Sequence, residues 1–322
     1  IYASNAKSNS GDFMIGIATK KYFQENIIKE KNIKFTDSDC RNSNLYNNVN
    51  IEKLNNYDYI VVGSGGLILP DSSVNMTSCW QWNISKENIK KIRKPIFVIS
   101  IGWNLFFNQD MTMTSRENNS RIPKRIEIFR ENIKVLIDIS KHFTLRHKSD
   151  VENLLKITGE EYREKVRYEM CPTVWYSKKY LKPNISENAK SFAIEIKDDR
   201  EWRRYHKIGK QKYYNWLLNN VIKKHINKGE KILYLSHDGS KNFYNFLKRK
   251  RINIGYLDNS VGNEKKILEN YSKIHTIYCS AGHSQMISYG LGIKIISLVT
   301  HPKIRNFCDD IGDTNYIDVN NL

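Results

Sequence analysis

The chain has 322 residues, of which 40% are hydrophobic and 27% charged, so it can fill packed cores and does not read as a long disordered tract. This length suits two domains better than one core. The 52 Lys and Arg residues against 34 Asp and Glu give a net charge of +18, which favours anionic partners but also fits a basic, solvated surface.

The cysteines and histidines argue against cross-links and metal sites. Five cysteines are scattered without a CxxC pair, which fits a reducing, cytoplasmic compartment, and the histidines show no metal-ligand spacing. No apolar run approaches the ~20 residues of a membrane span. The basic residues are dispersed and no nucleic-acid-reading motif is present, so we expect no nucleic-acid partner. The positive charge would suit docking at the inner face of an anionic membrane.

The first half of the sequence alternates apolar runs with amphipathic stretches, the pattern of a parallel sheet with helices on both faces. A glycine-bearing loop at 9–12 should open a helix over 13–23, and a second helix is expected over 126–140. Buried strands are predicted at 57–62, 95–101 and 142–145. Their carboxyl ends, where ligands of such sheets bind, carry Gly63 to Gly66, Gly102-Trp103 and Arg146.

A polar, lysine-rich stretch at 177–188 with a proline predicts a boundary, so we expect domains over residues 1–178 and 190–322. The α/β pattern then restarts, with a long amphipathic helix over 210–227. Four further strands are predicted, at 191–196, 231–236, 274–279 and 294–298. The loop after the third of these carries His283 at the start of a short helix, which makes His283 the best single candidate for chemistry.

The order of short motifs along the chain resembles the polysaccharide pyruvyl transferase family over nearly the whole length. The motifs are Asn-x-Gly-Asp at 9–12, Gly-x-Gly-Gly at 63–66, Lys-Pro-strand-Gly at 94–102, Leu-Arg-x-x-Ser at 145–149, Cys-Pro-Thr at 171–173, Ser-x-x-His at 280–283, Gly-Ile-Lys at 292–294 and Phe-x-x-x-Ile-Gly at 307–312. Each motif alone is weak, and their joint order is more specific.

The resemblance implies an α/β fold of two Rossmann-like parallel-sheet domains facing a central cleft, the GT-B architecture. It implies transfer of a pyruvyl group from phosphoenolpyruvate onto two hydroxyls of a sugar, giving a cyclic ketal and phosphate without a metal or other cofactor. The acceptor would be a surface polysaccharide or its lipid-linked precursor. The N-terminal domain would supply the acceptor side and part of the donor site, and the C-terminal domain the donor side.

Carried over by motif, Arg146 matches the family arginine that faces the donor, and His283 matches the histidine of the C-terminal loop. A histidine titrates near neutrality and suits proton transfer, so we expect His283 and Asp12 to be catalytic. The expected donor-binding residues are Arg146, Ser280, Gly282 and Lys303. The expected acceptor-binding residues are Gly65, Gly66, Trp103, Asn104 and His237.

Structural roles remain open for these residues. His283 and Asp12 could cap the helices that follow them, Arg146 could form an ordinary ion pair, and the glycines could form a turn without a ligand. A lone His-Asp dipeptide such as 237–238 is often structural as well.

One departure from the family bears on the donor. The family loop reads Ser-Arg-x-His, and this chain has Ala281 at the arginine position, which removes a bidentate anion clamp. Either another cation replaces it, such as Lys303, Arg305 or the cluster of Arg200, Arg203 and Arg204, or the donor has changed. The alternatives are therefore a GT-B glycosyltransferase with a nucleotide-sugar donor, a family member that has lost activity, or a non-catalytic binding protein.

Overall fold

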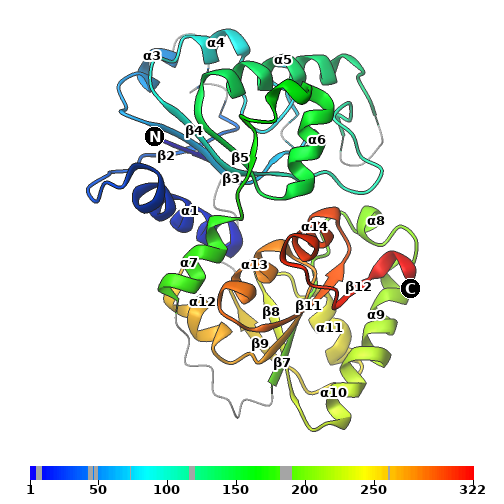
Figure 1. Ribbon diagram of the computed structural model, residues 1–322. Helices are drawn as coiled ribbons and strands as arrows, with labels where there is room; N and C mark the ends of the chain where they lie inside the picture. Colours follow the sequence, from blue (N-terminus) through cyan, green and yellow to red (C-terminus); the bar gives the residue numbers. More distant parts are fainter. Residues whose placement is uncertain are drawn as a thin grey trace. The chain divides into compact units, whose positions relative to one another are not determined.

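The computed structural model describes residues 1–4, 9–42, 46, 50–72, 74–115, 120–181, 191–259 and 262–322 (Figure 1). The chain divides into two compact units. The first comprises Ile1–Ala6 and Ile15–Pro172, and the second comprises Lys7–Met14 and Thr173–Leu322. The second unit therefore includes a short segment from the start of the chain. The sequence analysis placed this segment in the first of its two predicted domains, 1–178 and 190–322. Residues 182–188 of the predicted boundary stretch lie outside the described residues.

The first unit is built on a six-stranded parallel sheet with the strand order β2-β1-β3-β4-β5-β6. Its strands are β1 (Tyr2–Ser4), β2 (Asp37–Asp39), β3 (Ile60–Ile68), β4 (Ile96–Trp103), β5 (Ser140–Leu145) and β6 (Arg167–Tyr168). The central strands β3 and β4 are buried on both faces, which explains their continuous apolar sequences.

The helices of this part of the chain cover the sheet. They are α1 (Ser10–Tyr22), the π-helical η1 (Phe23–Ile28), α3 (Ile51–Leu54), α4 (Lys86–Lys90), α5 (Lys124–Ile139), α6 (Lys148–Thr158) and the 3₁₀ turn η2 (Glu160–Tyr162). Figure 1 shows α5 and α6 together on one side of the sheet. Their buried stripes, including Phe129, Ile133 and Leu154, pack into the same core as β3 and β4.

The sequence predicted that the glycine run 63–66 forms a loop after a strand. This prediction is wrong, because β3 continues through the run to Ile68. Gly63 and Gly65 have φ values of 110° and 117°, which side chains rarely adopt, and the register with β4 shifts between Gly65 and Ile68. Gly102 and Trp103 likewise belong to β4. Both strands therefore extend further toward the carboxyl edge of the sheet than their apolar residues alone indicate.

The second unit contains another six-stranded parallel sheet, with the order β12-β11-β10-β7-β8-β9. Its strands are β7 (Ser191–Glu195), β8 (Lys231–Ser236), β9 (Gly255–Asp258), β10 (Thr276–Cys279), β11 (Lys294–Val299) and β12 (Tyr316–Asp318). The chain runs outward from β7 to β9, returns to β10, and then runs outward on the other side. The loops after β7 and β10 therefore flank the topological switch point, the usual ligand position in such sheets.

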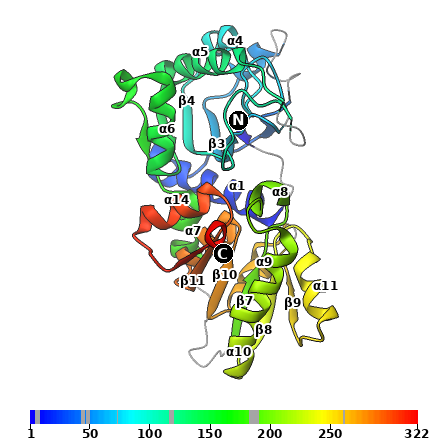
Figure 2. The same cartoon turned by 90° about the vertical axis from the view of Figure 1, so that its right-hand side faces the viewer.

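The helices of the second part of the chain pack on both faces of this sheet. They are α7 (Pro172–Tyr180), α8 (Glu201–Arg204), α9 (Lys210–Leu217), the π-helical η3 (Leu218–Ile222), α10 (Lys223–Asn227), α11 (Asn242–Arg249), α12 (Glu264–Tyr271), α13 (Gly282–Gly290), α14 (Pro302–Ile311) and the 3₁₀ turn η4 (Val319–Asn321). Figure 2 shows α9 and α10 along β7 and β8, where Tyr213, Leu217 and Val221 pack against Phe192 and Tyr234. The predicted helix over 210–227 therefore contains a π-helical segment.

The fold class is confirmed: each unit is a Rossmann-like parallel sheet with helices, as the alternating pattern predicted. The sequence missed the short strands β1, β2, β6, β9 and β12, which have only two to four residues each and too few apolar positions to show a period. No helix of the described residues is long and apolar enough to cross a membrane.

Candidate functional site

Asp12 stands at the start of α1, in the segment that groups with the second unit. Its backbone N–H donates to Asn9 Oδ1 at 2.9 Å, and Asn9 Nδ2 donates to Asp12 Oδ2 at 2.7 Å. This reciprocal pair is a variant of the capping box. The interaction with Asn9 fixes Oδ2 of the carboxylate, whereas Oδ1 is the oxygen on the side of His283.

His283 lies beside that carboxylate, with its Nε2 4.0 Å from Asp12 Oδ1. The imidazole also lies directly over Gly11, where an added Cβ would be only 1.7 Å from Nδ1 of the ring. The side chains of His283 and Asp12 are 23% and 19% exposed, so a ligand can reach both. The two residues predicted to be catalytic are therefore brought together, at a distance suited to proton transfer through small adjustments.

His237, predicted to bind the acceptor, is buried. Its Nδ1 lies 2.6 Å from Ser10 Oγ, its Nε2 lies 2.9 Å from Tyr271 Oη, and its backbone oxygen accepts from Ser10 N–H. Burial, with a smaller effect from Lys197, lowers the pKa of His237 to about 4. The residue is thus a neutral clamp that holds the start of α1 on the second unit, and an acceptor role stays a prediction.

A charged cluster follows β7, and the sequence analysis did not single out its key member, Lys197. Lys197 Nζ forms an ion pair with Asp238. Burial alone would lower the pKa of Lys197, but Asp199 and Asp238 raise it above its usual value. Arg204, which is 2% exposed, pairs with Asp199 at 3.0 Å. Lys197 directly follows the end of a predicted strand. Because ligands of parallel sheets bind at the carboxyl ends of the strands, the reasoning that pointed to Arg146 would also have pointed to Lys197.

Lys303, predicted to bind the donor, lies at the start of α14 and beside the His283 loop. Its Cε would be 3.6 Å from a Cβ added at Gly282. Burial would raise the pKa of Asp199, but Arg204, Lys197 and Lys303 hold it well below its usual range. Of the other proposed substitutes for the missing arginine, Arg305 pairs with Asp309 and Asp318. Lys303 is therefore a cation beside the loop in which Ala281 takes the place of the family arginine.

Arg146, in the first unit, is buried directly after β5, and no carboxylate of the described residues forms an ion pair with it. It is 3% exposed, and neither Nε nor Nη2 has a hydrogen-bond partner among the described residues. Its Nη2 would be 2.3 Å from a Cβ added at Gly102, so this glycine makes room for the guanidinium. A buried cation without such partners is costly, and a bound anion would offset this cost. Donor binding by Arg146 stays a prediction.

The predicted acceptor residues of the first unit fall at the same carboxyl edge of its sheet. A Cβ at Gly66 would be 2.6 Å from Cγ of Asn104, so these two residues are in close contact. Trp103 N–H donates to Asp150 Oδ2 at 3.0 Å, and its ring packs edge-on against Phe129. A Cβ added at Gly65 would meet no atom of the described residues within 4 Å. Acceptor binding by these residues stays a prediction.

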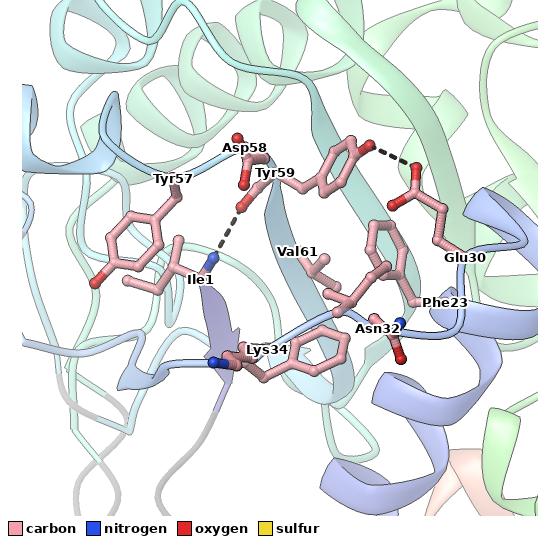
Figure 3. A pocket seen from close by; sticks show the side chains of 11 residues that line it. Ile1, Phe23, Glu30, Asn32, Lys34, Tyr57, Asp58, Tyr59 and Val61 are labelled. Carbon is pink, nitrogen blue, oxygen red and sulfur yellow. Dashed lines mark hydrogen bonds between the residues drawn. The ribbon is translucent and has the colours of Figure 1, made fainter.

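The cavity in Figure 3 lies at the opposite, amino-terminal edge of the first sheet. It has a volume of about 280 Å³ and is lined by residues at the starts of β1 and β3, by Phe23 of η1 and by the segment that connects η1 to β2. Tyr59 Oη donates to Glu30 at 3.2 Å. Ligands of parallel sheets bind at the carboxyl ends of the strands. This cavity therefore does not coincide with the candidate site. Among the described residues, no group of three or more His, Cys, Asp or Glu could hold a metal ion.

Comparison with known structures concerns the fold. UDP-GlcNAc 2-epimerase from Methanocaldococcus jannaschii superposes with a TM-score of 0.51 at 13% identity, covering 98% of this chain and 86% of that one. The S. aureus MnaA–UDP complex gives a TM-score of 0.51 at 12% identity, covering 98% and 83%. At such identities the likeness concerns the fold alone, and it supports two Rossmann-like domains of the GT-B type. No curated protein matches the chain.

The sequence family is more specific. The family model for polysaccharide pyruvyl transferases matches residues 9–302, which is most of the chain. The chain belongs to the polysaccharide pyruvyl transferase family, as its motifs predicted, and it is thus a member of a family of transferases that act on polysaccharides.

Replacing Gly11 by alanine should displace the His283 ring. The added methyl would overlap Nδ1, so we expect a destabilisation of about 1–3 kcal/mol in urea unfolding. Gly282→Ala is the matched control, because its Cβ would meet only Lys303 at ordinary contact distance within a helix. Equal stability of the Gly11→Ala variant and the wild type would contradict the contact.

Arg146→Met should leave the ligand-free protein as stable as the wild type or stabilise it by about 1 kcal/mol or more, because it removes an unpaired buried charge. Arg125→Met is the contrasting variant. Arg125 is equally buried but donates to the backbone oxygens of Pro70 and Asn75, so its loss should cost about 1–3 kcal/mol. Denaturant titration of both variants checks this, and a larger loss for Arg146→Met would refute the interpretation.

The clamp at His237 should make stability sensitive to acid. The pKa of His237 in the folded protein, about 4, lies below the ordinary histidine value. The contribution of His237 to the free energy of unfolding is therefore complete above pH ~6.5 and is lost as the pH falls toward 4. The His237→Gln variant keeps hydrogen-bonding groups but has no side chain that titrates in this range. Its free energy of unfolding should therefore fall by ~3 kcal/mol less than that of the wild type over the same pH range. His275→Gln, at an exposed histidine, is the control. Parallel pH profiles for wild type and His237→Gln would contradict the prediction.

Proposed function

We propose that this protein transfers a pyruvyl group from phosphoenolpyruvate to a sugar of a surface polysaccharide or of its lipid-linked precursor. The family membership supports a saccharide-directed transferase. The buried, unpaired guanidinium of Arg146 carries the proposal of an anionic donor. Phosphoenolpyruvate bears a phosphate and a carboxylate, either of which can accept two parallel hydrogen bonds from one arginine.

In the proposed reaction, His283 would act as the general acid and Asp12 as the general base. His283 as a general acid donates a proton to the methylene carbon of the donor, which becomes a methyl group and leaves C2 electron-poor. A sugar hydroxyl attacks C2 and loses its proton to Asp12. A second hydroxyl then attacks C2, the bond from C2 to the phosphate oxygen breaks, and the second proton leaves with the phosphate. Two C–O bonds form, and one phosphate is released for each ketal.

Lys303 is the proposed replacement for the arginine that Ala281 lacks. Its position beside Gly282 supports this role, and the N-terminus of α13 presents backbone N–H groups at the same loop. A lysine offers a point charge without a planar fork, so it would hold the anion with less geometric precision. The proposal therefore includes a weaker donor complex than an arginine in that loop would give.

Donor binding can be tested without knowing the acceptor. We expect phosphoenolpyruvate at millimolar concentration to raise the melting temperature of the wild type, because a ligand that binds only the folded state stabilises it. Arg146→Met and Lys303→Met should lose most of this shift. Lys248→Met, at an exposed lysine of α11, should keep it.

A nucleotide sugar is the discriminating ligand in the same assay. A shift with UDP-GlcNAc and none with phosphoenolpyruvate would overturn the pyruvyl donor and favour a nucleotide-sugar transferase instead. The absence of a shift with either ligand would count against donor binding by this chain. An equal shift in the wild type and in Arg146→Met would remove Arg146 from the donor site.

A further inference from the structure

Glu195 is a buried acid at the topological switch point of the second sheet, with no part in the proposed proton transfers. It is the last residue of β7 and is 2% exposed. β7 and β10 are neighbours there, and the loops that follow them carry Lys197 and His283. Burying a carboxyl group is unfavourable without strong hydrogen bonds, so its partners show what the residue does.

The partners of Glu195 belong to the His283 loop. Its Oε2 accepts from the backbone N–H of Ala281 at 2.9 Å and from that of Ser280 at 3.1 Å. A second link runs the other way, because the backbone N–H of Lys197 donates to Ser280 Oγ at 2.6 Å. One side chain therefore holds two successive amides of the loop that leads into α13.

We propose that Glu195 is a positioning residue for His283, acting through the backbone of Ser280 and Ala281. His283 is two residues beyond Ala281 and lies against Gly11, where the ring has little freedom to adapt. A shift of the loop backbone would therefore move the imidazole away from Asp12. The link to catalysis rests on the proposed function, whereas the hold on the loop can be measured without it.

A pH dependence follows from the geometry. Burial raises the pKa of Glu195 to about 7, with Lys197 opposing this and Asp238 adding to it. The other titratable groups that face the carboxyl group are Tyr213, Tyr234, Tyr271 and Cys279. Because the closed loop covers the carboxyl group, opening it would hydrate Glu195 and return its pKa toward the ordinary value. The closed loop is thus favoured below pH 7 and weakened as the pH rises through 7.

Hydrogen–deuterium exchange of the whole protein measures the loop directly, through peptides that cover residues 279–286. After correction for the intrinsic pH dependence of exchange, we expect wild-type protection to fall several-fold between pH 6 and pH 8.5. Glu195→Gln keeps a neutral acceptor for both amides, so its protection should not change with pH. Glu195→Ala should lose protection at every pH. Glu269→Gln, at an exposed acid of α12, should behave as the wild type does.

Either of two outcomes would overturn the proposal. Unchanged loop protection in Glu195→Ala, with the variant folded by circular dichroism, would show that Glu195 does not hold the loop. The same pH dependence in Glu195→Gln and wild type would assign the titration to another group. Because no donor or acceptor is added, failure here is distinct from failure of phosphoenolpyruvate to bind.

Discussion

The missing side chain at Gly11 is the constraint on which the proposed chemistry depends. His283 occupies the space that any other residue at position 11 would fill, and this brings its Nε2 to 4.0 Å from Asp12. The rest of that part of the second unit secures this contact from both sides. Ser10 is held by His237, and the loop before His283 is held by Glu195. The absence of a side chain at Gly11 therefore determines where the His283 ring can lie, and the buried residues His237 and Glu195 hold the segments on either side of this contact.

The cations Lys197 and Arg204 of the second unit have carboxylate partners, whereas Arg146 of the first unit has none among the described residues. In the second unit, Lys197 is paired with Asp238 and Arg204 with Asp199, so burial of these cations is offset within the protein. Arg146 in the first unit has no such carboxylate among the described residues. A folded protein gains nothing in stability from a buried cation of this kind. Under the proposed function, the anionic donor would offset this cost when it binds to Arg146.

Much of this could be predicted from the sequence, and the limits have physical causes. The long buried strands and the candidates at their ends, including Arg146 and His283, follow from apolar runs and from the geometry of parallel sheets. The continuation of β3 through Gly63 and Gly65 could not be predicted, because glycines signal a turn when only the sequence is known. The grouping of the segment around Ser10 with the second unit reflects long-range contacts, such as that between Ser10 and His237, more than 200 positions away. Glu195 was missed because a single acid inside an apolar strand has no local signature.

The most direct test of the account is a crystal structure of the protein with phosphoenolpyruvate bound. The account predicts that an anionic oxygen of the ligand lies within hydrogen-bonding distance of both Arg146 Nε and Arg146 Nη2, the two atoms without partners in the protein. A complex in which phosphoenolpyruvate binds elsewhere and leaves these two nitrogens unpaired would contradict it.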